Sequence, residues 1–142
     1  MSSAGNQSAG NQSSGYKSSA GSRKFVRIDK TGDAVIVSPL FTFASFTEAD
    51  LAAEWKAVQH EIEAADVKHV IVDLGEIPYF GSTVLEWMVQ MWKQAKAKGG
   101  SLATCNCSQI GREVLHAARF DTLWGVFETR DEALKSVGAT PA

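Results

Sequence analysis

Apolar residues recur with two different periods, and the changes of period divide the chain into elements. The stretch KFVRIDKTGDAVIVSP, from Lys24, holds two β-rich runs separated by the turn-forming residues 30–33. Two such runs around a turn predict an opening β-hairpin. Thr47 offers an N-cap for a helix that extends to about residue 65. Its apolar residues, at steps of four and three, form one stripe that should face a sheet: Leu51, Trp55, Val58, Ile62 and Ala65.

The rest of the chain continues this alternation of strands and helices. KHVIVDL, residues 68–74, is short, β-branched and almost continuously apolar, which is typical of a central strand. A second helix is predicted from about Ser82 to Lys98, before a pair of glycines. A strand at SLATCN, a helix capped by Ser108 and a short strand at WGVFET follow. Thr129 and Glu132 form a capping box for a last helix.

The predicted order is therefore ββαβαβαβα. Helices that alternate with strands imply right-handed crossovers, so we expect an α/β fold with a mostly parallel sheet of four to five strands. Helices pack on this sheet, and only the opening hairpin must be antiparallel. We expect this domain to occupy residues 24–138, with a disordered C-terminus at 139–142. Residues 1–23, which repeat AGNQS, have too few apolar side chains to fold and predict a flexible tail.

Composition narrows the classes of partner. The formal net charge of −2 and the pI near 5.9 lack the basic footprint of nucleic-acid binding. No apolar run approaches the roughly 18 residues that span a bilayer, and no signal-peptide core is present. We therefore expect a cytoplasmic protein that binds no nucleic acid and does not insert into the membrane.

Side chains that could carry catalysis or bind a metal are scattered. On a strand, Cys105 and Cys107 would share one face with Cα atoms about 6.5–7 Å apart, which is at or beyond the limit for a disulfide. We expect two reduced, half-buried packing residues. His60, His69 and His116 have no metal-ligand spacing, and no Ser/His/Asp order or glycine-rich phosphate loop is evident. The sequence thus predicts neither an enzyme nor a cofactor or metal site.

The start of the second helix has an unusual composition. Gly81 can adopt φ > 0 and make a sharp turn, and Ser82 can then cap the helix, which contributes about 1 kcal/mol. A cap alone is one interpretation; an accessible regulatory hydroxyl is the other. Trp87 and Met91 lie on a second apolar strip of this helix and are residue types enriched where proteins meet. They either face a partner or are covered by neighbouring helices.

The order of these motifs resembles a known family. VIVDLGEIPYFGSTVLEWMVQMWKQAKAKGGSLATCN, followed by SQIGREVLHAARFDTLWGVFETRDEAL, is similar to the STAS domain of bacterial anti-sigma factor antagonists, over about residues 25–137. In that family an Asp-Ser-Ser-Gly-Leu type motif begins the helix after the Asp-Leu strand. Here that place is held by residues 81–85. Gly81 replaces the usual aspartate, and Val84 replaces the usual glycine.

The resemblance implies a switch protein with two states. The unphosphorylated form binds a serine-kinase anti-sigma factor, the phosphorylated form releases it, and a phosphatase is a possible further partner. The family's phosphorylated serine falls on Ser82, with Thr83 as a second possible acceptor. The partner-binding residues predicted on this basis are Gly81, Ser82, Thr83, Val84, Trp87 and Met91.

Two other functions are compatible with the same fold. The first is a constitutive adaptor in a larger assembly, such as the accessory STAS subunit of a lipid transporter, which Gly81, Val84 and Trp87 fit better than the standard motif would. The second is a small-ligand or nucleotide sensor that uses the backbone N–H groups of Ser82 and Thr83. The absence of a nearby Lys or Arg makes the sensor the weakest of the three.

Overall fold

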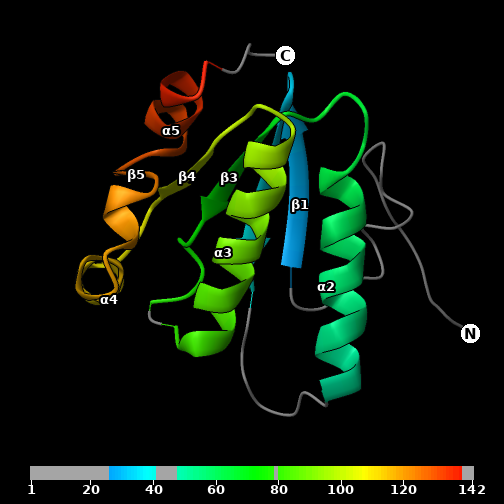
Figure 1. The fold of residues 1–142 in the computed structure, drawn as a ribbon. Helices are drawn as coiled ribbons and strands as arrows, with labels where there is room; N and C mark the ends of the chain where they lie inside the picture. The colour runs from blue at the N-terminus through cyan, green and yellow to red at the C-terminus, as the bar shows by residue number, and fades with distance from the viewer. Residues whose placement is uncertain (1–25, 41–47, 79, 139–142) are drawn as a thin grey trace, which may run out of the picture.

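The computed structural model describes residues 26–40, 48–78 and 80–138 (Figure 1). The expected tail at 1–23, the C-terminus at 139–142 and the proposed cap at Thr47 lie outside these residues.

The described residues form the predicted ββαβαβαβα order, with a short 3₁₀ helix, η2, before the last strand. The bounds are β1 Val26–Thr31, β2 Ala34–Pro39, α2 Glu48–Ile62, β3 His69–Asp73, α3 Ser82–Ala97, β4 Leu102–Cys105, α4 Gln109–Ala117, η2 Phe120–Thr122, β5 Gly125–Phe127 and α5 Arg130–Ser136.

The strands of the described chain form one five-stranded sheet in the order β1-β2-β3-β4-β5. β1 and β2 are antiparallel, with Asp29 opposite Ile36, and Gly32 at φ 60° makes the turn between them. The other neighbouring pairs are parallel, as each helical crossover requires. The predicted α/β fold with an opening antiparallel hairpin is confirmed.

Side chains that alternate along the strands serve two separate hydrophobic layers. The larger layer joins alternate strand residues such as Val35, Val72 and Leu102 to α2, α3 and α4. The smaller layer joins Ile36, Ile71 and their neighbours to α5. Figure 1 shows α3 in front of the strands and α2 to the right of β1, with α5 at the upper left. The sheet therefore separates α5 from the other helices.

The first crossover helix is shorter than predicted. Val58 and Ile62 are completely buried, as the apolar stripe indicates, but α2 ends at Ile62 and Ala65 is exposed. Lys98, at the end of α3, donates hydrogen bonds from its Nζ to the carbonyl oxygens of Ile62 (2.6 Å) and Ala64 (2.8 Å). A lysine that satisfies the last carbonyls of a helix stabilises its end at that point.

The two cysteines lie on opposite faces of the sheet, so the expectation of a shared face is wrong. Asn106, between them, has φ 57° and ends the regular alternation of β4. Cys105 packs in the layer of α5 and Cys107 in the layer of α2, α3 and α4. Both are free, as predicted, and they are buried rather than half-buried. Burial raises the pKa of the Cys105 thiol to about 12 and also raises the pKa of Cys107.

Candidate functional site

The segment between β3 and α3 is tied to the sheet at its start. The Leu74 N–H donates to the Cys105 carbonyl oxygen at 3.0 Å, and the Ile77 N–H donates to the Leu74 carbonyl oxygen at 3.3 Å. Leu74 and Ile77 are each 1% exposed. Their burial fixes a turn whose residues Gly75 and Glu76 face solvent.

The second half of this segment rests on the first turn of α4. The Ser108 Oγ donates to the Pro78 carbonyl oxygen and accepts from the Gly111 N–H at 3.0 Å, so it caps α4 as predicted. A Cβ at Gly111 would lie 3.1 Å from Cε2 of Phe80, so the helix and the buried Phe80 ring are in close contact. Ser108 and Phe80 together position the residues that begin α3.

The start of α3 differs from the sequence prediction in one respect. Gly81, not Ser82, occupies the N-cap position, and Ser82 is the first helical residue. Gly81 has φ −112° and ψ −157°, which is extended backbone open to any residue, and a Cβ there would meet nothing within 4 Å. Gly81 does not use the positive φ that glycine allows. The helix therefore begins one residue earlier than it would if Ser82 were the N-cap.

The two hydroxyl residues at this helix start are accessible. Ser82 and Thr83 are both exposed, and the first turn of α3 holds no acidic residue. The first N–H groups of a helix carry its positive end, which favours an added negative charge. The position is thus chemically open to a phosphate.

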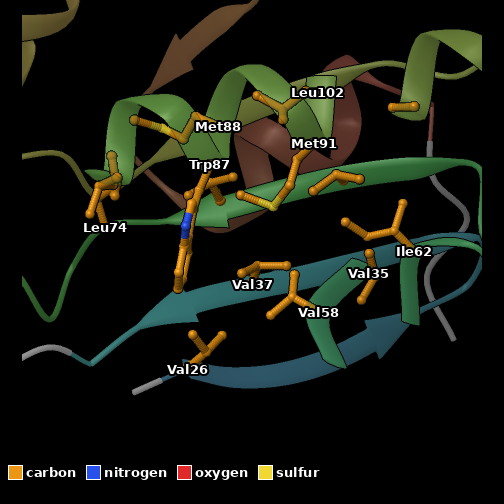
Figure 2. Close-up of a cluster of buried hydrophobic side chains, with 14 of the residues drawn as sticks. Val26, Val35, Val37, Val58, Ile62, Leu74, Trp87, Met88, Met91 and Leu102 are labelled. Carbon is orange, nitrogen blue, oxygen red and sulfur yellow. The ribbon is translucent and has the colours of Figure 1, made fainter. Parts of the chain in front are cut away.

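The other predicted partner-binding residues belong to the core. Val84, Trp87 and Met91 are 4%, 8% and 1% exposed. The ring of Trp87 stacks on Trp55 of α2, with centroids 5.0 Å apart. Figure 2 shows Trp87 and Met91 among the buried side chains between α3, α2 and the sheet. Because α2 and the sheet cover the strip that these three side chains form, they are not available to a partner, and the prediction that they bind one is wrong.

Asp73, the last residue of β3, is a site residue whose partner the sequence did not reveal. It is 8% exposed, and both of its oxygens accept hydrogen bonds. Oδ1 accepts from the Gly75 N–H (3.0 Å) and from Asn106 Nδ2 (3.1 Å). Oδ2 accepts from Nη2 (2.9 Å) and Nε (3.2 Å) of Arg130, the first residue of α5. We call these four residues the Asp73 clamp.

The clamp stabilises the charged form of its carboxylate. Burial by itself raises the pKa of Asp73, but the hydrogen bonds from Gly75, Asn106 and Arg130 and the Arg130 charge outweigh it. The pKa of Asp73 is therefore held below its ordinary value of 3.8. Arg130 is 57 residues away in sequence, and only its place at the start of a capped helix marks it in the chain.

Among the described residues, no three His, Cys, Asp or Glu side chains are grouped so that they could hold a metal ion. The helices of the same residues include none with the length and apolarity to cross a bilayer.

Comparison with solved structures places this arrangement among known folds. An anti-sigma-factor antagonist (STAS) domain protein from Planctomyces limnophilus is 25% identical, with a TM-score of 0.68 over 80% of this chain and 98% of that one. The anti-sigma factor antagonist SpoIIAA in its unphosphorylated form is 15% identical, with a TM-score of 0.62 over 79% and 95%. Bacillus SpoIIAA in the phosphorylated form is 15% identical, with a TM-score of 0.58 over 79% and 98%.

The comparison with curated proteins returns no match. The model of the STAS domain family matches residues 25–133, which include every strand of the described residues and the first four residues of α5. That range contains both the exposed start of α3 and the Asp73 clamp. The chain belongs to the STAS domain family.

Proposed function

We propose that this protein is a partner-switching module of the anti-sigma factor antagonist type, which works in the cytoplasm. Its unphosphorylated form binds a serine-kinase anti-sigma factor, phosphorylation at Ser82 releases that partner, and a phosphatase resets the switch. The observation that carries the proposal is an exposed serine at the first position of α3, within a STAS fold, beside a segment fixed by Ser108 and Phe80. Thr83 is the second acceptor.

The expected docking surface is centred on the exposed residues Gly81, Ser82 and Thr83. The first turn of α4, which contains Ile110, is joined to the preceding segment because Ser108 donates to the Pro78 carbonyl oxygen. Ile110 is 54% exposed and supplies apolar area. A partner that covers this surface would remove the Ser82 hydroxyl from water.

Phosphorylation would act on the complex rather than on the fold. A phosphate adds about −1.5 to −2 charges, and the positive end of α3 tolerates or mildly stabilises it. The same charge enclosed in an interface without a partner costs several kcal/mol, and each 1.4 kcal/mol changes affinity about tenfold. The modified domain should therefore stay folded and lose its partner.

Mass spectrometry after incubation with the cognate kinase and ATP tests the site of modification. We expect phosphate on Ser82, with none on the Ser82→Ala variant unless Thr83 accepts it. Ser82→Asp should weaken binding to the kinase by about tenfold or more, whereas the uncharged Ser82→Asn should retain most of the affinity. If neither hydroxyl is modified and Ser82→Asp binds normally, the switch is excluded.

A constitutive adaptor in a larger assembly is the second candidate. It is favoured by Gly81 in place of the family's aspartate and by the absence of an acidic residue from the first turn of α3. Pull-down from the native host separates the two functions. Recovery of a transporter subunit, unaffected by Ser82→Asp, would support the adaptor; recovery of a kinase-like anti-sigma factor would support the switch.

A further inference from the structure

We propose that Arg130 is a positioning residue for the segment that carries Ser82, and that it acts through Asp73. Through this contact α5, on one face of the sheet, limits how often the turn after β3 opens. That turn begins the connection to α3 on the other face. The consequence for partner binding rests on the proposed function, whereas the coupling itself does not.

Asp73 is the point at which three parts of the chain meet. Its carboxylate receives two hydrogen bonds from Arg130 of α5, one from Asn106 after β4, and one from the Gly75 N–H in the turn that follows β3. Charge-assisted hydrogen bonds of this kind are stronger than neutral ones, and Arg130 presents two donors to a single oxygen. Loss of the guanidinium would leave Oδ2 without its protein donors on a carboxylate that is 8% exposed.

The turn at Gly75 is tightly packed against the clamp. A Cβ at Gly75 would lie 3.1 Å from Asp73 Oδ1 and 3.3 Å from the Cβ of Asn106. A carboxylate that rotates or moves away would break the hydrogen bond that it accepts from the Gly75 N–H at 3.0 Å. From this turn the chain leads on to Gly81, and on the way Pro78 and Phe80 contact α4. At the upstream end, the clamp holds the Gly75 N–H. It acts there beside the buried Leu74 and Ile77 and an Arg27–Glu76 ion pair at 3.8 Å.

The guanidinium of Arg130 is partly exposed and has a second acidic neighbour besides Asp73. Its side chain is 35% exposed, and Nη1 also lies 3.8 Å from Oδ2 of Asp29 on β1. The helix that begins at Arg130 is fixed independently by the capping box of Thr129 and Glu132 and by the buried Ala133. Removal of the guanidinium should therefore change the clamp without unfolding α5.

Hydrogen exchange of the full chain tests the coupling. In Arg130→Gln we expect the Gly75 and Ile77 amides to exchange about tenfold faster, because the turn opens more often. Arg112→Gln is the matched control, since Arg112 pairs with exposed Glu128 at 3.4 Å and does not touch Asp73. Arg130→Lys, which keeps the charge but not the paired donors, should give an intermediate rate. Unchanged exchange in Arg130→Gln would overturn the proposal.

The same substitution in an Asp73→Asn protein tests whether the effect of Arg130 depends on Asp73. In Asp73→Asn, the further change Arg130→Gln should alter exchange of the turn by less than twofold, because the contact is already weakened. An undiminished tenfold effect would mean that Arg130 acts by another route, and the proposal would fail.

Phosphorylation of Ser82 provides the functional readout. We expect kcat/KM of the kinase for Arg130→Gln to change at least about threefold relative to Arg112→Gln. No phosphorylation of the unaltered protein would defeat the proposed function but leave the exchange result standing. Faster exchange with unaltered phosphorylation would defeat the positioning role of Arg130 and leave the proposed function intact.

Discussion

Gly81 departs from the family's aspartate without a structural need for glycine. Its backbone is extended, and nothing lies within 4 Å of a Cβ built there. An aspartate would therefore fit and could accept a hydrogen bond from the N–H groups that open α3. An aspartate at position 81 would also place a negative charge at the positive end of the helix.

We expect Gly81→Asp to be more stable than Gly81→Ala by about 1 kcal/mol, because both lack the flexibility of glycine but only aspartate can cap. Urea denaturation of the two variants measures the difference. The comparison with Ala separates capping from the backbone effect. Equal stabilities would show that position 81 does not accept the cap.

Asp73 should make stability depend on pH in a known direction. Its pKa is lowered in the folded state, so the unfolded state binds the proton more readily below the ordinary value of 3.8. The stabilisation is complete above that value and is lost as the pH falls through the pKa of the folded state.

Asp73→Asn should accordingly cost about 2 kcal/mol at neutral pH and progressively less as the pH is lowered past 3.8. Denaturation in urea at a series of pH values measures the free energy of unfolding of both proteins. A difference that stays constant across this range would mean that the carboxylate charge is not what stabilises the clamp.

Ser108 links two elements and should affect both. Ser108→Ala removes the N-cap of α4 and the hydrogen bond to the Pro78 carbonyl, which should destabilise the protein by about 1–2 kcal/mol and speed exchange in residues 76–80. Ser136→Ala is the control, because its Oγ donates only to the Ala133 carbonyl within α5. We expect a change within about 0.5 kcal/mol for the control. Similar losses in both variants would contradict the linking role.

The sequence predicted elements well where the signal is local. The caps at Ser108 and Thr129 were found because a side chain and a backbone N–H a few residues later suffice to form them. The sequence does not decide whether Trp87 is buried or exposed, because the answer depends on where α2 packs.

The parts of the site that were missed depend on long-range contacts. Asp73 lies within the predicted strand at 68–74, but its partner Arg130 comes from the other end of the domain and is brought there by the sheet. The cysteines were assigned to one face because nothing in the sequence showed that Asn106 has a positive φ.

The two cysteines lie in different hydrophobic layers, so the reactivity of each thiol measures how often its layer opens. Cys105 is fully buried in the layer of α5, and Cys107, 9% exposed, belongs to the layer of α2, α3 and α4. Because burial raises the pKa of both, their thiolates form mainly when a layer opens. We expect alkylation of Cys105 in the native protein to be slower than in urea by at least about a thousandfold.

Mass spectrometry of partly alkylated protein would assign the label to each cysteine. Alkylation of Cys105 at the rate of an unfolded thiol would show that its layer is open in solution.

The strand order has a consequence for how the protein is made. Each strand pairs with the one synthesised just before it, so the sheet can extend in step with the ribosome, one crossover at a time. Arg130 emerges after all five strands. A nascent chain can thus assemble its sheet while Asp73 still lacks its guanidinium, and the turn before Ser82 reaches its final rigidity only when translation of the last helix is complete.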